Sequence, residues 1–291
     1  MTEGVSLAGM TEVPVVIVVA QRPGPATGLP TRTEQADLEF VLHAGHGEFP
    51  RAIFAPGSIE ECFELMSRTF ALAEASQGPV FLLTDQFLAD SYRDVMPFKL
   101  NEAAAPEGTP QEEAAGYYQR YAITDSGVSP RRIPGAGLEL VVADSDEHDE
   151  AGHITEDLAL RAKMVEKRLR KAKILTDNIV PPEYSGEDAP ELLLLNWGSS
   201  KGAVKEAASR MRAGGKSVGT LHFSQVWPLA PVQFLERLQG ARRVVCVEGN
   251  AMGQFSRLIR RETGFVVDRL ISRYDGLPIT PDYIMEELDH E

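Results

Sequence analysis

The segment VPVVIVVA (13–20), followed directly by QRPGPATGLPTRTEQADL (21–38), decides the fold and the site expected of this chain. The first segment is almost entirely Val and Ile, which predicts a strand apolar on both faces, as in a parallel sheet covered by helices. The second segment cannot form a helix, because glycine and proline recur throughout it. Ligands of parallel sheets collect at the carboxyl ends of the strands, so this loop is a candidate binding site.

The loop combines hydroxyl groups with positive charge: Thr27, Thr31, Thr33, Arg22 and Arg32. Such a mixture suits an anionic ligand rich in oxygen. Arg22 is the favoured contact, because a planar guanidinium can hold a carboxylate through two parallel hydrogen bonds. The alternative is that both arginines are surface charges on a connector, and the residues alone leave this open.

Composition limits the possible functions. The chain has 291 residues, of which 43% are apolar, and this length suggests about two domains. A net charge of -14 argues against a surface for nucleic acid or anionic membrane. The two cysteines, Cys62 and Cys246, lie in separate apolar segments and are expected to be buried free thiols, which fits a reducing cytoplasm. No apolar run approaches the ~20 residues that span a bilayer, and no export signal is evident.

The first domain, at 1–95, is expected to be incomplete. Strands are predicted at 51–55 and 79–84, with a helix between them for which Ser58 is the expected N-cap. Only three strands precede the change of composition near Tyr92, whereas doubly wound domains usually have five or six. The opening MTEGVSLAGM predicts the end of a helix, as though the chain began in the middle of a fold.

Residues 96–188 are expected to form an acidic connector and a linker helix. The first part is rich in Pro, Glu, Ala and Gly and lacks periodicity. The segment HITEDLALRAKMVEKRLRKAKIL (153–175) predicts a helix with Thr155 as N-cap, acids in its first turn and bases in its last.

A second parallel α/β domain is predicted at 189–291, because strands and helices alternate again. The expected elements are the strand ELLLLNWG, a helix at 201–213, the strand SVGTLHF, a helix near 232–239, and the strand RRVVCVEGN followed by the helix AMGQFSRLIRRE.

Two further constellations favour structural roles. The turn VEGNAMGQF (247–255) could present backbone amides to an anion, but it lacks GxGxxG spacing and its glycines suit any strand-to-helix turn. His43, His46 and Glu48 do not have helical metal-ligand spacing, since Gly45 and Gly47 interrupt it. No metal site is therefore expected, and HDEAGH (148–153) is interpreted as a solvated surface.

The segments QRPGPATGLPTRTEQADL, HAGHGEFPR (43–51) and HDEAGHITED (148–157) together resemble the alpha subunit of the 2-oxoacid:ferredoxin oxidoreductases. These thiamine-diphosphate enzymes convert a 2-oxo acid and coenzyme A to an acyl-CoA, and the 2-oxoglutarate branch is the most similar. The resemblance spans nearly the whole chain. It implies an α/β fold with a partial thiamine-diphosphate pyrimidine-binding domain, built on a parallel sheet, and a transketolase-C-like α/β domain.

The resemblance also implies roles for individual residues. Arg22 would hold the substrate carboxylate, while Gly24, Thr27 and Gly28 would shape the adjoining wall of the cleft and Thr31 would contact the cofactor. Glu248, Asn250 and Gln254 would lie at a subunit interface. No catalytic residue and no metal ligand is assigned to this chain.

The implied cofactors are thiamine diphosphate with Mg²⁺ and a [4Fe-4S] cluster, both expected mainly on partner subunits. This chain has no G-D-G motif to bind the metal, and two cysteines cannot supply four thiolates. The implied partners are the beta subunit, ferredoxin, a 2-oxo acid and coenzyme A, with no nucleic acid and no membrane.

Two alternatives to a catalytic subunit stay open. The Tyr-Pro-Ile-Thr-Pro motif and the glutamate that precede this region in the family are absent, so the chain could be a truncated or non-catalytic assembly subunit. A stand-alone nucleotide-binding enzyme is less favoured, because no phosphate-loop motif occurs.

Overall fold

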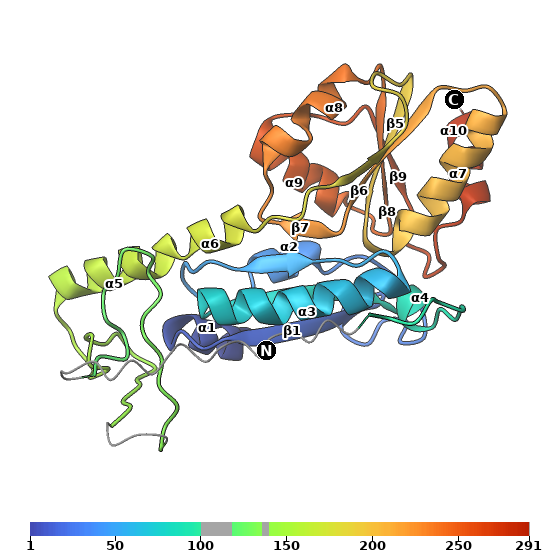
Figure 1. Cartoon of the computed structure of the whole chain (residues 1–291). Coiled ribbons are helices and arrows are strands. Elements are labelled where there is room, and N and C mark those ends of the chain that lie inside the picture. The colour runs from blue at the N-terminus through green and yellow to red at the C-terminus, as the bar shows by residue number, and fades with distance from the viewer. Residues whose placement is uncertain (100–117, 136–139, 291) are drawn as a thin grey trace.

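The computed structural model describes residues 1–99, 118–135 and 140–290. Two sheets divide the described residues into two lobes, which Figure 1 shows one above the other. The first lobe holds a four-stranded sheet in the order β1-β3-β2-β7, and the second a five-stranded sheet in the order β4-β6-β5-β8-β9. Parallel strands predominate in both sheets, so the expected α/β class is confirmed.

The first lobe contains the three predicted strands. Its elements are α1 (Thr2–Met10), β1 (Val15–Gln21), α2 (Leu38–Leu42), β2 (Ala52–Phe54), α3 (Ile59–Ser76), β3 (Pro79–Asp85) and α4 (Gln86–Ala89). β1 and β2 both pair in parallel with β3. One expectation is wrong: β1 is an edge strand of this sheet and is not covered on both faces, since Val18 is 51% exposed.

Helix α3 connects β2 to β3, and its 18 residues are long enough for the crossover that a parallel pair of strands needs. Ser58 caps it as predicted, because its hydroxyl accepts a hydrogen bond from the Glu61 N–H at 3.2 Å. The buried face of the helix, with Leu65 and Leu72, packs with Phe54 and Leu82 of the sheet.

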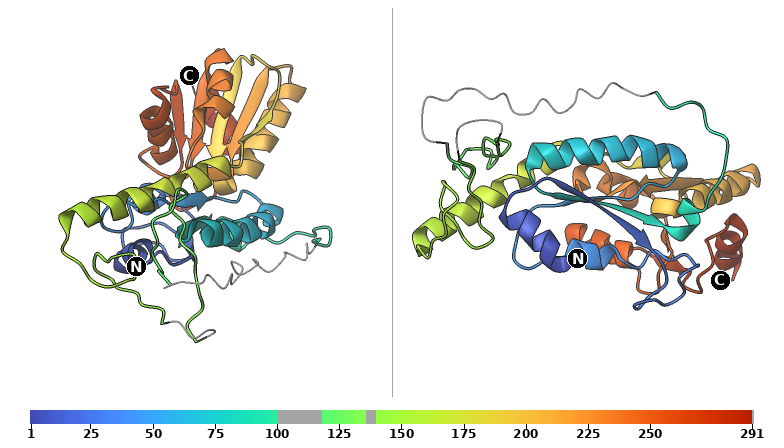
Figure 2. Two further views of the ribbon diagram at one scale, coloured as in Figure 1. Left: turned by 60° about the vertical axis from the view of Figure 1, so that its left-hand side comes forward. Right: turned by 90° about the horizontal axis from the view of Figure 1, so that it is seen from below.

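The linker is two helices in line, α5 (Leu158–Arg170) and α6 (Ala172–Asp177), which run along the first lobe and project beyond it (Figure 2). The predicted N-cap Thr155 is wrong. Asp157 caps α5 instead, since its carboxylate accepts the N–H groups of Ala159 and Leu160 at 2.8 and 3.0 Å. The acidic residues therefore precede the first turn, whereas bases do occupy the last turn as expected. Part of the predicted connector, residues 100–117, lies outside the described residues.

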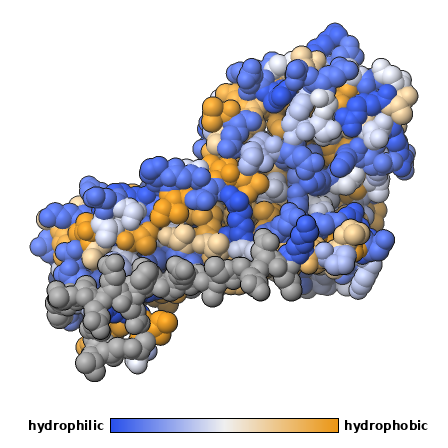
Figure 3. Space-filling model, viewed as in Figure 1, coloured by the Kyte–Doolittle hydropathy of each residue, from blue (hydrophilic) through white to orange (hydrophobic). Residues whose placement is uncertain are grey.

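A buried ion cluster fastens this linker to the first lobe. Glu12, Lys167 and Lys171 are all almost fully buried, and Lys167 Nζ lies 2.6 Å from Glu12 Oε1. Lys171 pairs with the other carboxylate oxygen. Beside it, apolar residues of α6 pack on α3, and apolar surface gathers there in Figure 3.

The second lobe contains every strand and helix predicted for it, together with elements that the sequence pattern did not reveal. Its elements are β4 (Glu183–Ser185), β5 (Leu192–Trp197), α7 (Lys201–Ala213), β6 (Val218–Phe223), α8 (Leu235–Gly240), β8 (Val244–Glu248), α9 (Gln254–Thr263), β9 (Arg269–Ser272) and α10 (Pro281–Asp289). Two short 3-10 turns, Gly198–Ser200 and Pro231–Gln233, precede α7 and α8.

One strand crosses between the lobes. β7 (Gln225–Trp227) follows β6 in the chain but pairs antiparallel with β2 of the first sheet. One of the apolar clusters accordingly runs through both lobes and includes Ile53, Phe81, Leu195 and Phe255. Because the two lobes share a sheet and an apolar cluster, their relative position is fixed. The predicted domain boundaries at 95 and 188 stay a prediction.

Candidate functional site at the facing sheet edges

The carboxyl edges of the two sheets meet. Asp85 ends β3 of the first lobe and accepts a hydrogen bond from the Ser199 hydroxyl, in the turn after β5 of the second lobe. Gln35, in the segment after β1, donates to the Trp197 carbonyl at 2.9 Å. Because carboxyl ends of parallel strands are where such folds place ligands, this junction is the candidate site.

The loop after β1 turns sharply at Gly28. The Leu29 N–H donates to the Pro23 carbonyl at 3.1 Å, and Gly28 has φ +50°. A Cβ at Gly28 would lie 1.8 Å from Pro23 O, so no other residue can hold this conformation. The loop therefore has a defined shape, which the glycine dictates.

The base of the loop is closed by side chains. The Asp37 N–H donates to Gln21 Oε1 at 3.0 Å, which joins the end of β1 to the segment beyond the loop. The Glu34 carboxylate accepts the Gly24 N–H, and burial raises the pKa of Glu34 despite that bond. Burial also raises the pKa of Asp37. Two carboxyl groups of reduced acidity thus lie beside the loop that carries Arg22.

The predicted substrate and cofactor residues share the exposed surface of this loop. Arg22, Gly24, Thr27, Gly28 and Thr31 are all exposed. Within the described part of the chain, the guanidinium of Arg22 makes no hydrogen bond and no ion pair. An exposed cation without an internal partner, held on a shaped loop at a carboxyl edge, is available to bind an anion. The structure brings these residues together, but their binding roles stay predictions.

Asp85 is a site residue that the sequence analysis missed. It is 2% exposed, and burial raises its pKa although Ser199, the Leu88 N–H at 3.0 Å and Thr33 donate to it. A carboxylate directly after a buried strand was a signal that could have indicated it. The residue joins three segments: the end of β3, the loop after β1, and the turn before α7.

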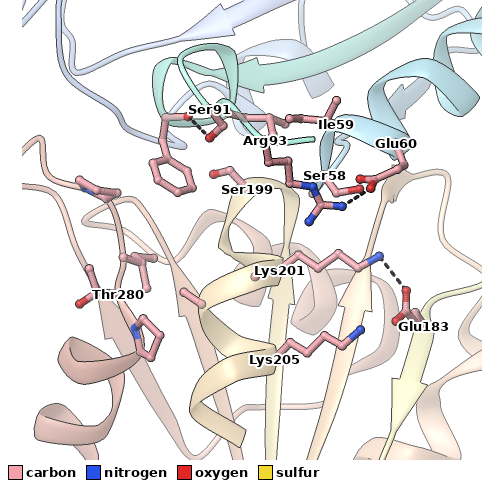
Figure 4. Close-up of a pocket in the computed structure, with 18 residues that line it drawn as sticks. Ser58, Ile59, Glu60, Ser91, Arg93, Glu183, Ser199, Lys201, Lys205 and Thr280 are labelled. Atoms are coloured by element: carbon pink, nitrogen blue, oxygen red, sulfur yellow. Dashed lines mark hydrogen bonds and ion pairs between the residues drawn. The ribbon is translucent and has the colours of Figure 1, made fainter. Parts of the chain in front are cut away.

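A recess of about 650 Å³ opens beside this junction (Figure 4). Its walls come from the start of α3, α4, β4, the first turns of α7 and residues 278–281. Lys201 and Lys205 extend from α7 on one side, and Lys201 contacts Glu183 of β4 at 2.7 Å. Arg93 pairs with Glu60 on the opposite wall. Three cations and two carboxylates line the recess, so its charges nearly balance.

The predicted interface residues lie inside the chain. Glu248 and Asn250 are 0% and 1% exposed, and Asn250 Nδ2 donates to the Gln35 carbonyl at 3.1 Å. Gln254 is half-buried and donates to the Ala36 carbonyl at 2.7 Å. Asn250 and Gln254 thus bind the segment after the loop to the second lobe, and Glu248 accepts a hydrogen bond from Asn250 Nδ2 at 2.9 Å. A further role at a subunit interface stays a prediction, and for the two buried residues it could only be indirect.

The histidines considered as metal ligands have other contacts. The His43 ring lies 2.9 Å from the Glu39 carbonyl, and the backbone N–H of His46 donates to Ser6 Oγ at 2.6 Å. Among the residues that the structure describes, no three His, Cys, Asp or Glu side chains gather so as to hold a metal ion. Over the same residues, no helix has both the length and the apolar character needed to cross a membrane.

Fold and site together define a class of protein. It has two α/β lobes whose sheets meet at the carboxyl ends of their strands, and a glycine-containing loop with exposed arginines lies there. Residues 1–167 match the family described as pyruvate flavodoxin/ferredoxin oxidoreductase, thiamine diphosphate-binding. The chain belongs to this family, and the resemblance inferred from the sequence is confirmed.

Individual relatives are alpha subunits of such enzymes. The chain is 36% identical over 295 residues to subunit alpha of 2-oxoacid:ferredoxin oxidoreductase 1 from Sulfurisphaera tokodaii, covering 99% of this chain and 46% of the relative. It is 34% identical to 2-oxoglutarate oxidoreductase subunit KorA from Mycobacterium tuberculosis, covering 97% and 43%. The chain therefore spans about half the length of these relatives.

A solved structure has the same fold. The 2-oxoglutarate:ferredoxin oxidoreductase from Magnetococcus marinus, with 2-oxoglutarate, coenzyme A and succinyl-CoA bound, matches with a TM-score of 0.85 and 30% identity over 99% of this chain and 50% of that chain.

Proposed function

We propose that this chain acts as the alpha-subunit part of a 2-oxoacid:ferredoxin oxidoreductase whose substrate is 2-oxoglutarate. The reaction joins a 2-oxo acid and coenzyme A to give an acyl-CoA and CO₂, and two electrons pass singly to two ferredoxins with release of a proton. The structure of similar fold that holds 2-oxoglutarate supports this choice of substrate. The beta subunit and ferredoxin are the proposed partners.

The proposal rests mainly on the exposure of Arg22 and on its lack of a partner in the part of the chain that the structure describes. Its guanidinium is exposed and has no partner among the described residues, on a loop whose shape Gly28 fixes. Arg22 binds the C1 carboxylate of the 2-oxo acid through two parallel hydrogen bonds and thereby orients the reacting carbonyl. Gly24, Thr27 and Gly28 form the adjoining wall of the substrate-binding cleft.

The residues fit thiamine diphosphate only in part. Within the described ranges no three His, Cys, Asp or Glu side chains gather as they would around the Mg²⁺ of a bound diphosphate, and the chain's two cysteines cannot form a [4Fe-4S] site. Phe87, 40% exposed after β3, and Thr31 on the loop are suited to cover the organic ring. When bound, the cofactor supplies the nucleophilic carbon and the electron sink that decarboxylation requires. We assign its metal and the cluster to partner subunits.

Reconstitution tests the proposal. The chain is co-expressed with a beta subunit of the same family, and reduction of a redox dye is measured with 2-oxoglutarate, branched 2-oxo acids and pyruvate. Arg22→Lys should raise the KM for 2-oxoglutarate by about tenfold or more, because an ammonium cannot make the paired hydrogen bonds. Arg32→Lys, the same change ten residues along the loop, is the matched control and should leave KM within about twofold.

The outcomes separate the alternatives. An assembled complex without any 2-oxo-acid-dependent reduction would favour a non-catalytic assembly subunit. Activity in which Arg22→Lys and Arg32→Lys behave alike would place the carboxylate elsewhere.

A further inference from the structure

Gln35 occupies a socket formed by Trp197, Gly198, Gly249 and Asn250 of the second lobe. Its side chain donates to the Trp197 carbonyl at 2.9 Å and accepts the Gly249 N–H at 2.8 Å. Its backbone N–H donates to the Gly249 carbonyl at 2.6 Å, and its carbonyl accepts Asn250 Nδ2 at 3.1 Å. Gln35 is only 3% exposed, and each of its four polar atoms thereby forms a hydrogen bond with the second lobe.

The glycines of the socket leave room for this side chain. A Cβ at Gly198, which has φ +57°, would lie 2.9 Å from Gln35 Nε2. A Cβ at Gly249 would lie 3.3 Å from Gln35 Cγ and Oε1. Gly198 and Gly249 therefore pack closely against the glutamine side chain. The socket restricts the motion of the segment around Gln35 more than a single hydrogen bond could.

The socket is connected to Arg22 through the base of the loop. Gln35 lies two residues before Asp37, whose N–H is held by Gln21, the residue that precedes Arg22. The Thr33 N–H also donates to the Gly276 carbonyl of the second lobe at 3.2 Å. The carboxyl-side end of the loop is thus fixed by the second lobe, and the other end by β1.

We propose that Gln35 is a positioning residue: seated in its socket, it makes the conformation of the Arg22 loop, and hence substrate binding, depend on contact between the two lobes. The role rests on the function proposed for Arg22. Gln35 does not touch the substrate. It holds the base of the loop in place, so that less of the loop has to be ordered when the substrate binds.

The test compares two buried glutamines. Gln35→Ala is paired with Gln225→Ala, because Gln225 is 2% exposed and also joins separate segments, accepting the Val180 N–H at 2.8 Å and donating to the Trp227 carbonyl. Both variants should lower Tm. Only Gln35→Ala should raise the KM for 2-oxoglutarate in the reconstituted complex, by about tenfold, with kcat changed less than about threefold.

A second readout needs no activity. Trypsin can cut the full chain after Arg32 in the loop, whereas Pro23 protects the bond after Arg22. In a brief digestion read by mass spectrometry, Gln35→Ala should speed the cut after Arg32 by about fivefold or more, and Gln225→Ala should not.

Each result decides the inference. An unchanged rate of cutting after Arg32, or a KM that rises equally in both variants, would overturn it, as would faster cutting with a native KM. Restored loop protection and KM in Gln35→Asn relative to Gln35→Ala would support it. Failure of the proposed function looks different: the wild-type complex would then have no 2-oxo-acid-dependent reduction, whatever the digestion shows.

Discussion

Glu61 on α3 and Lys201 on α7 form an ion pair between the two lobes, with Lys201 Nζ 2.6 Å from Glu61 Oε1. Glu61 also accepts the Gly57 N–H at 2.6 Å and faces the His222 ring. Burial pushes the pKa of Glu61 upward, but the contacts with His222, Lys201 and the Gly57 N–H outweigh it and lower the pKa from 4.5 to about 2. The ionised carboxylate therefore stabilises the contact between the lobes.

This relationship predicts an acid dependence of stability. Because the folded pKa lies below the usual value, the contribution is complete above pH ~4.5 and is lost as the pH falls toward ~2. Glu61→Gln should remove roughly 2–3 kcal/mol of the fall in unfolding free energy between pH 5 and pH 2, measured by urea denaturation. Glu206→Gln, at an exposed pair with Arg210, is the control and should leave the profile unchanged. Equal profiles for wild type and Glu61→Gln would refute the assignment.

The buried cluster around Glu12 predicts a large loss of stability when its only carboxylate is removed. Glu12→Gln leaves Lys167 and Lys171 buried without a counter-charge and should cost roughly 3–5 kcal/mol of unfolding free energy. Asp177→Asn breaks the exposed pair with Lys173 and should cost less than about 0.5 kcal/mol. Chemical denaturation at pH 7 distinguishes the two, and similar costs would mean that the cluster is not buried in solution.

Gly28 predicts a local defect in the loop. Gly28→Ala places a methyl group 1.8 Å from Pro23 O at φ +50°, so the loop must rearrange. We expect the KM for 2-oxoglutarate to rise by about tenfold or more in the reconstituted complex. Gly4→Ala, on α1 with open space around it, is the control and should keep a native KM. A native KM in Gly28→Ala would show that the loop does not shape the cleft.

The two cysteines should differ in reactivity. Burial raises the pKa of both thiols, that of Cys246 well above the ordinary value, but Cys246 is fully buried whereas Cys62 is half-buried and so within reach of a reagent. One thiol should react with Ellman's reagent in the native chain and two in urea. Cys62→Ser should abolish the native reaction, and persistence of that reaction would indicate that β8 opens readily.

Local patterns were sufficient for the long elements. The aliphatic runs of β3, β5 and β8 and the periodic faces of α3, α7 and α9 match their predicted positions, because burial imposes those patterns over many residues. β1 also lies where its Val and Ile run predicts it, although this edge strand is only partly buried. β4, β7 and β9 have only three or four residues, too few to show a period, and were missed. Thr155 was preferred over Asp157 as N-cap because both types cap helices and only the backbone decides between them.

In the candidate site, too, some residues could be predicted from local sequence and others could not. The exposed loop residues around Arg22 could be selected from composition and resemblance, since glycine, proline and cations are visible in the sequence. Asp85 and Ser199 are 114 positions apart, and Gln35 and the Trp197 carbonyl are 162 apart. No local pattern links such residues, because their contact depends on how the two sheets dock.

The order of the long strands and helices, the non-helical character of the glycine-rich loop and membership of the family follow from local preferences and motifs in the sequence. The folded molecule alone decided that β7 would join the first sheet, that Glu248 and Asn250 would be buried within the chain, and that Gln35 would find its socket. Those outcomes depend on long-range packing and on satisfying buried polar groups, which act only once distant segments are brought together.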